Sequence, residues 1–205
     1  MHITSRGLKQ AVYMIKTNLP IYLASRSPRR RNLLKQINID FKSFEVDLNE
    51  IVHKNEKPNK IVTRLANEKM KIAKGRIKRG IIITADTIVV LDGNVIGKPK
   101  NKKDAKRILK QLSGRTHIVY TGFAIYNSIK NLLLTEYEKT FVKFRNINDK
   151  EIDEYIKSGS PMDKAGAYGI QDDFGAVFID KINGCYYNVV GLPLTKVYQA
   201  LLKII

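Results

Sequence analysis

The sequence predicts one α/β domain built on a mixed β-sheet with helices packed against it. Segments with strand and helix patterns alternate early in the chain, which is typical of parallel strands joined by helices. Hairpin signals appear later, and hairpins join antiparallel strands. The 205 residues suit one domain with a sizeable core, and we find no internal repeat, low-complexity block or linker.

The first predicted elements are a strand over residues 21–24 and a helix over residues 28–37. Ser27 is a favourable N-cap, and Pro28 fits the first helical position, where its missing N–H costs nothing. Three apolar side chains of this helix are expected to face the core, namely Leu33, Leu34 and Ile37. A strand over residues 41–46 follows.

The middle of the chain continues the alternation after an irregular acidic segment over residues 47–50. Pro58 opens a long helix that reaches about residue 78. Residues 81–91 form an apolar strand, and Asp92-Gly93 marks a hairpin turn into a short strand over residues 94–96.

Antiparallel pairing is expected to dominate the remainder. A helix over residues 102–112 closes at Gly114 and leads to strand-like runs over residues 117–126 and 132–145. Asn148, with a glutamate three residues later, starts a short helix. The last two elements are a hairpin over residues 176–190, turning at Asn183-Gly184, and a helix opened by Pro193.

The composition is that of an ordinary globular protein with a strong positive charge. Apolar residues make up 43%, charged residues 27%, and the net charge is +18. This charge fits nucleic-acid or membrane-surface binding, attraction of a small polyanion, or a plain bias towards Lys, Asn and Ile. Lysines are spread over the whole length, without an RNA-binding aromatic-basic motif or an apolar run of membrane-spanning length. Nucleic acid and membranes are therefore disfavoured as partners.

The single Cys185 excludes an internal disulfide and fits a reducing compartment, the cytoplasm. The histidines are too scattered to predict a Cys/His metal site, namely His2, His53 and His117. Residues 1–19 look like an extension outside the domain over residues 20–205. They lack the apolar segment of a secretory signal, and Met14 is an alternative start.

The turn from the first strand into the first helix has the features of an anion site. Arg29, Arg30 and Arg31 fill the first helical turn, where the helix dipole disfavours cations. A bound phosphate would explain them, because free N–H groups, guanidinium forks and the hydroxyls of Ser25 and Ser27 would converge on it. The alternative is a solvated basic patch, and this segment alone does not decide between the two.

Asp86 is the sharpest single candidate, because it lies inside an almost wholly apolar strand. A buried carboxylate is costly unless a cation, a metal or hydrogen bonds compensate it. Lys69 projects from the middle of the apolar stripe of its helix, at about 100° per residue. It needs an anionic partner or a route to water. We favour function for both over a structural Asp and a lysine that reaches solvent.

Three further features are weak alone. Lys98 follows a hairpin strand in Gly97-Lys98-Pro99, and Glu50 ends the acidic segment. The glycine-spaced loop over residues 163–171 offers Tyr168 and Gln171 to stack on and hydrogen-bond a base, although it matches neither a Walker A loop nor a dinucleotide fingerprint. Together with the anion site, these features predict a nucleotide phosphohydrolase with carboxylates for a divalent metal.

The chain also resembles the Maf family, the septum-formation-type nucleoside triphosphate pyrophosphatases, over about residues 21 to 204. The matching motifs follow the family's order: Leu23-Ala24-Ser25-x-Ser27-Pro28-Arg29-Arg30, Leu65-Ala66 with Lys69, Ala85-Asp86-Thr87, Gly97-Lys98-Pro99, Leu112-Ser113-Gly114, Asp163 through Gln171, and Asn188 through Leu194. Several motifs in one order are far more specific than any one of them.

The resemblance implies an elongated fold shared with the inosine-triphosphate pyrophosphatases, often dimeric, so a homodimer is expected. It implies hydrolysis of a nucleoside triphosphate to the monophosphate and pyrophosphate with Mg²⁺ or Mn²⁺, for which Glu50 and Asp86 are the candidate ligands. Asp86 matches the general base. The polar active-site set is matched by Ser25, Arg30, Glu50, Lys69 and Lys98, and the positions for substrate choice by Arg29, Thr87 and Gln171.

Arg29 and the loop over residues 163–171 resemble the dTTP/UTP branch of the family rather than the branch for 7-methyl-GTP. Asp172-Asp173-Phe174 departs from the pattern, because the family more often has a glycine after the position of Gln171. Two alternative functions stay open. The protein could catalyse the same reaction on modified purine nucleotides, or it could be a basic, non-enzymatic protein that binds nucleic acid or a regulatory partner.

Overall fold

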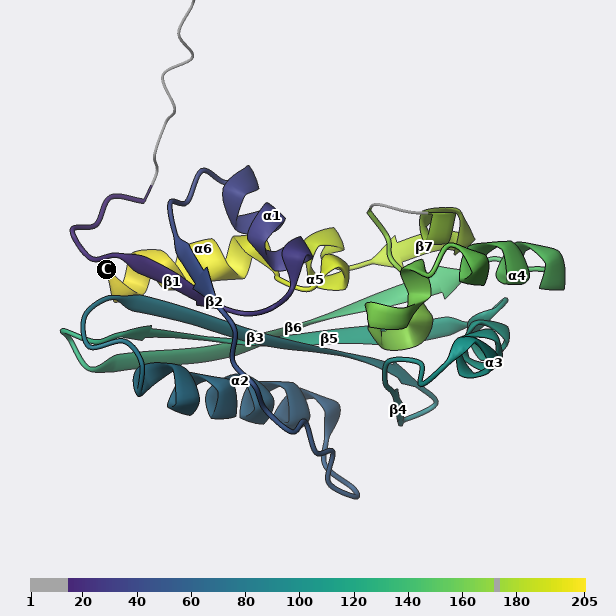
Figure 1. Cartoon of the computed structure of the whole chain (residues 1–205), viewed down its shortest axis with the longest axis horizontal. Helices are drawn as coiled ribbons and strands as arrows, with labels where there is room; N and C mark the ends of the chain where they lie inside the picture. The colour runs from purple at the N-terminus through teal and green to yellow at the C-terminus, as the bar shows by residue number, and fades with distance from the viewer. Residues whose placement is uncertain (1–14, 172–173) are drawn as a thin grey trace, which may run out of the picture.

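The long strands of one mixed sheet run the length of the molecule (Figure 1). The computed structural model describes residues 15–171 and 174–205, and this part of the chain forms seven strands. Six follow the order β2 (Lys42–Phe44), β1 (Ile21–Ala24), β3 (Ile81–Leu91), β5 (Thr116–Asn127), β6 (Leu132–Phe144) and β7 (Ile179–Asn183), and β4 (Asn94–Ile96) pairs with β3. β1 is parallel to β2 and β3, and the other pairs are antiparallel, which confirms the predicted mixed sheet.

Helices cover the two faces of the sheet at one end of the molecule and gather at the other end (Figure 1). α2 (Pro58–Lys74) lies along one face, whereas α1 (Pro28–Gln36) and α6 (Leu194–Ile204) lie on the other. α3 (Lys102–Leu112) and α4 (Asp149–Lys157) pack near each other at the far end. Each end of the molecule has its own apolar cluster, and the middle of the sheet lies between these two clusters.

Local sequence rules account for most helix ends. The Ser27 hydroxyl accepts the Arg30 N–H at the start of α1, and Asn148 and Glu151 form the expected capping box of α4. Gly114 follows α3 with a φ of +69°, a left-handed conformation that favours glycine. Two elements are shorter than expected, because β2 covers only part of residues 41–46 and α2 ends at Lys74, before Gly75.

The hairpin predicted over residues 176–190 is wrong in its second half, and its first strand starts late, because a 3-10 helix spans Phe174–Phe178. β7 ends at Asn183 as expected, but the chain then forms the short helix α5 (Tyr186–Val190). The Asn-Gly pair and the β-prone tyrosines and valines favoured a strand. The helix instead brings Asn188 into the core, where its side chain donates to the Val119 carbonyl and the Thr140 hydroxyl.

The end of the predicted extension contacts the domain. Ile15 and Leu19 pack against the apolar cluster beside α1 and α6. Residues 1–14, including the alternative start Met14, lie outside the described residues, so the division into an extension and a domain stays a prediction. Asp172 and Asp173 also lie outside them. Within the described part of the chain, no helix is long and apolar enough to cross a membrane.

Candidate active site

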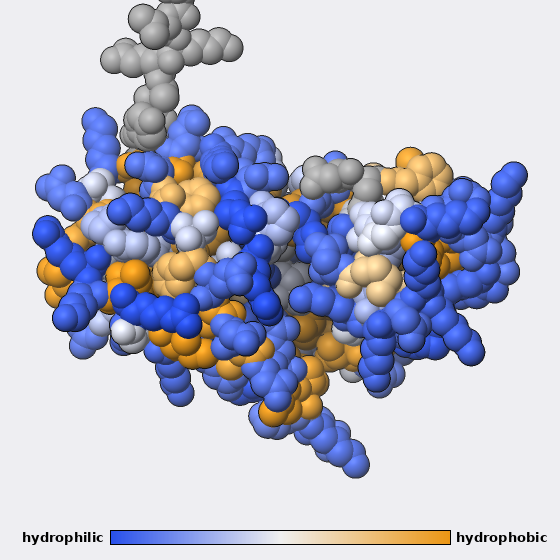
Figure 2. All heavy atoms as spheres, in the orientation of Figure 1, coloured by the Kyte–Doolittle hydropathy of each residue, from blue (hydrophilic) through white to orange (hydrophobic). Residues whose placement is uncertain are grey.

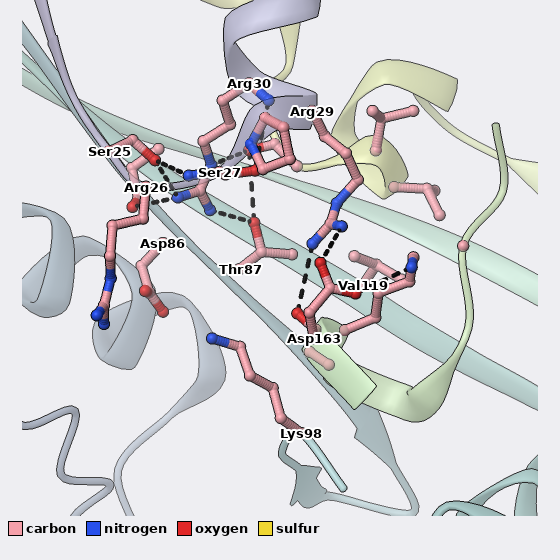
Figure 3. A pocket seen from close by; sticks show the side chains of 18 of the residues that line it. Ser25, Arg26, Ser27, Arg29, Arg30, Asp86, Thr87, Lys98, Val119 and Asp163 are labelled. Carbon is pink, nitrogen blue, oxygen red and sulfur yellow. Dashed lines mark hydrogen bonds and ion pairs between the residues drawn. The ribbon is translucent and has the colours of Figure 1, made fainter. Parts of the chain in front are cut away.

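A pocket of about 290 Å³ lies near the middle of the sheet, between the two ends of the molecule. Figure 2 shows a hollow near the middle of the molecule, between two lobes whose surfaces are largely hydrophilic. The lining comes from segments far apart in the sequence: the β1–α1 turn, Glu50, Lys69 on α2, Asp86 and Thr87 on β3, Lys98, the loop over residues 163–171, and the end of α5. All the site residues predicted from the sequence line this one pocket, and Figure 3 shows ten of its residues labelled.

The β1–α1 turn supplies one wall. The Ser25 hydroxyl accepts the N–H of Ser27 at 3.2 Å, and the Ser27 hydroxyl caps α1 by accepting the Arg30 N–H at 3.4 Å. Both hydroxyls therefore shape the turn, and each keeps its own O–H for a further acceptor. Arg31, the third arginine of the first helical turn, does not line the pocket and donates to the carbonyl of Arg26.

The position of Arg30 in the sequence predicts a guanidinium that is free to bind phosphate, but in the structure most of its N–H groups are bonded to the protein. Its guanidinium is buried, donating to the carbonyls of Gly191 and Ala85 at 2.8 and 2.9 Å, and to the hydroxyls of Thr87 and Ser25 at 2.9 and 3.4 Å. Burial lowers the pKa of Arg30, although the charges of Asp86 and Glu50 oppose this shift. With these bonds made, one N–H on Nη2 remains for a substrate oxygen.

Lys69 joins the two acidic groups of the site. Its Nζ lies 2.5 Å from Oδ1 of Asp86 and 2.6 Å from Oε1 of Glu50. The helix α2, which carries Lys69, can lie this close to the sheet because residue 122 on β5 is a glycine. A Cβ at Gly122 would come within 2.4 Å of the Val62 backbone on α2. The lysine predicted to need an anionic partner therefore has two, and the buried Asp86 has its cation.

The pKa values of the two carboxylates are shifted in opposite directions. Burial raises the pKa of Asp86 above its usual value, and the charge of Glu50 adds to this although Lys69 and Arg30 oppose it. Burial also raises the pKa of Glu50, but Lys69, Lys98 and Arg30 outweigh it and the net shift is downward. The Asp86 side chain is 7% exposed and that of Glu50 is 43% exposed, which explains why the upward shift from desolvation is outweighed by the neighbouring cations only in Glu50.

The residues expected to select the substrate also line the pocket. Arg29 forms an ion pair with Asp163 across the opening, with 2.7 Å between Nη1 and Oδ2 (Figure 3). Thr87 shares its hydroxyl between Arg30 and Thr121, both at 2.9 Å. The Gln171 side chain lines the pocket, and its buried Nε2 has no hydrogen-bond partner among the described residues. An unpartnered amide at this place is suited to a carbonyl of a ligand.

Sequence reasoning missed two contributors to the pocket. Arg26 lines it beside the two serines, and its 63% exposed side chain lies 3.7 Å from Asp47. Asp163 pairs with Arg29, a contact between residues 134 positions apart that no local pattern indicates. Tyr168, which the sequence offers for stacking on a base, has its ring packed edge-on against Phe144 and His117.

Glu50 and Asp86 fit a hard divalent cation. Mg²⁺ is commonly held by one or two carboxylates together with waters and substrate phosphates. Lys69 bonds to one oxygen of each carboxylate, which leaves the second oxygen of each for a cation. The described residues contain no group of three His, Cys, Asp or Glu side chains arranged for a metal, so the protein alone would supply a two-carboxylate set.

The fold is shared with a HAM1 protein from Coxiella burnetii. The two structures match with a TM-score of 0.51 at 14% sequence identity, over 90% of this chain and 99% of that chain. This likeness shows the fold alone, and it confirms the expected α/β architecture.

Curated relatives match nearly the whole domain, and each is named dTTP/UTP pyrophosphatase. The protein of Caldanaerobacter subterraneus subsp. tengcongensis is 45% identical over 184 residues, covering 89% of this chain and 88% of its own. That of Clostridium tetani is 47% identical over 179 residues, covering 86% and 93%. The family model described as Maf-like protein matches residues 20–204. The resemblance seen in the sequence motifs is thereby confirmed, and the chain belongs to the Maf family.

Proposed function

We propose that this protein hydrolyses dTTP and UTP to the nucleoside monophosphate and pyrophosphate. The observation that carries the proposal is the Asp86–Lys69–Glu50 cluster, whose first two members are buried, in a pocket also lined by arginine and lysine. The activity named for the relatives, at 44–47% identity, supports the choice of substrate.

Asp86 is assigned as the general base. Its second oxygen faces the pocket, and its raised pKa moves it towards the range in which a carboxylate removes a proton from water effectively. Lys69 holds the first oxygen and so fixes the direction of the second. The activated water attacks the α-phosphorus, the bond to the bridging oxygen breaks, and pyrophosphate leaves.

The cations of the pocket bind the triphosphate. Lys98 and Arg26 are exposed and able to move towards the phosphates, while Arg30 offers its remaining N–H from a fixed position. A divalent cation, Mg²⁺ or Mn²⁺, would be held by the free oxygen of Glu50 together with waters and phosphate oxygens and would neutralise phosphate charge, while Asp86 keeps its free oxygen for the proton.

The base is recognised at the other side of the pocket. Gln171 presents its unpartnered amide N–H groups, which match the carbonyl oxygens of thymine and uracil. Arg29, fixed by Asp163, and Thr87, fixed by Arg30, limit the space around the base. Because thymine and uracil share these carbonyls, one site serves both dTTP and UTP.

Asp86→Asn tests the proposal. Removal of the base is expected to lower kcat by about 100-fold or more, with dTTP still bound. Pyrophosphate release from dTTP, UTP and 7-methyl-GTP with Mg²⁺ or Mn²⁺ is the measurement. Preference for 7-methyl-GTP would move the substrate to modified purines, and full activity of Asp86→Asn would refute the mechanism.

Tight, steeply salt-dependent DNA or RNA binding that survives Asp86→Asn would instead favour a nucleic-acid-binding protein. A cytoplasmic location and a homodimer remain predictions. Fractionation of cells and light scattering of the purified chain test them.

A further inference from the structure

The loop that carries Gln171 is attached to a buried histidine that the proposed chemistry does not use. His117 on β5 is fully buried, and its Nε2 lies 2.7 Å from the Tyr168 hydroxyl. The other ring nitrogen, Nδ1, has no hydrogen-bond partner among the described residues. An apolar side chain would avoid that unbonded nitrogen, so the bond to Tyr168 is what distinguishes a histidine here.

Aromatic packing around this hydrogen bond restricts the position of the Tyr168 ring. His117, Phe144 and Tyr168 contact one another edge-on, with ring centroids 4.7 to 5.3 Å apart. Burial lowers the pKa of His117 to about 4, so the ring is neutral at pH 7 and pairs with a neutral hydroxyl without a buried charge.

The loop needs such support because its backbone is unfavourable. Gly166 and Ala167 have φ values of +74° and +59°, and an alanine adopts that region only where its surroundings impose it. Tyr168 follows directly. The next residue, Gly169, donates its N–H to the Tyr155 hydroxyl at 3.2 Å.

We propose that His117 is a positioning residue for base recognition. By holding the Tyr168 hydroxyl, it fixes the loop between two groups proposed to select the substrate: Asp163, which binds Arg29, and Gln171. His117 itself does not line the pocket, so it acts only through the loop. The inference rests on the proposed function, because it takes the base of a pyrimidine nucleotide as the ligand that Gln171 reads.

Removal of the bond from either side tests this role. Tyr168→Phe and His117→Phe are each expected to raise the KM for dTTP about tenfold, with kcat changed less than about twofold, because one buried hydrogen bond no longer orders the loop. The kinetics for dATP, whose adenine has no carbonyl to accept from the Gln171 amide, are expected to change little. The double variant is expected to lose no more than either single one. His117→Gln, whose amide can reach the hydroxyl, is expected to restore most of the dTTP preference.

Tyr126→Phe is the matched control. Tyr126 is also a buried tyrosine; it lies on β5, and its change to Phe removes one hydrogen bond, to Asn131, between two residues that do not line the pocket. Its nucleotide preference is expected to equal that of the unchanged protein, whatever its thermal stability. In a Gln171→Ala background, the effect of Tyr168→Phe on preference is expected to shrink to the part that acts through Asp163 and Arg29.

Three outcomes overturn the inference: equal loss towards dTTP and dATP, an effect that is undiminished in Gln171→Ala, or preference unchanged in folded Tyr168→Phe. Should Tyr168→Phe not fold, the comparison of His117→Phe with His117→Gln decides in the same way. An unchanged protein that hydrolyses neither dTTP nor UTP refutes the proposed function itself, which separates that failure from failure of the positioning role.

Discussion

The pocket buries ionisable groups in two opposite ways at its two sides. At the Asp86–Lys69–Glu50 cluster, opposite charges lie within 2.6 Å and compensate one another. Beneath the loop over residues 163–171, His117 and Tyr168 are buried with neutral rings, because burial lowers the pKa of His117 and raises that of Tyr168. The first arrangement keeps charge available for chemistry, whereas the second gives only shape. Substitutions at the two sides are therefore expected to affect different properties of the protein.

Lys69→Met tests the charged side and has the largest expected effect. It leaves Asp86 without its closest cation, so we expect activity to fall about 100-fold and stability by about 3 kcal/mol. Pyrophosphate release and urea unfolding measure the two quantities. Lys71→Met, at an exposed position of the same helix, is the control. Full activity of Lys69→Met would mean that the cluster is only structural.

The neutral side is expected to show itself in the pH dependence of stability. His117 has a folded pKa of about 4 against 6.5 in a model compound, so the unfolded chain takes up the proton first as the pH falls. Stability present above pH 6.5 is then lost on the way to pH 4, by about 3 kcal/mol at most. The difference in unfolding free energy between the unchanged protein and His117→Phe should therefore shrink from pH 7 to pH 4.5. A constant difference would show that His117 is not buried as a neutral ring.

Asp163→Asn probes the border between the two sides, with the smallest expected effect. The ion pair with Arg29 is partly exposed, so its loss should lower the preference for dTTP by about fivefold at most and change stability little. Asp153→Asn removes an ion pair with Lys106 that lies outside the pocket, and it should not change the preference. A larger fall with Asp153→Asn than with Asp163→Asn would contradict the assignment of Asp163.

The two sides also differ in how far the sequence predicts them. Asp86 and Lys69 interrupt the apolar patterns of a strand and a helix, so they are visible without a structure. The contacts of Asp163 and His117 join residues 134 and 51 positions apart, and no local pattern encodes them. For the same reason the position of Arg30 predicts an anion site, but not the protein acceptors that take most of its N–H groups.

The elements were predicted well where local rules decide them. Capping residues, glycine turns and apolar periodicity place most helices and strands within a few residues. The exception is α5, where packing of Asn188 against β5 and β6 overrides the β-propensity of its neighbours.

The hydrogen bond between Arg30 and the Gly191 carbonyl also constrains the order in which the chain folds during synthesis. The two residues are 161 positions apart, so a chain emerging from the ribosome holds Arg30 long before its acceptor exists. Until then the guanidinium has to stay hydrated, and α1 cannot settle fully onto the sheet. The substrate pocket is thus completed only when nearly the whole chain has been made. A nascent chain stalled before Gly191 should lack the pocket even where most of its strands have paired.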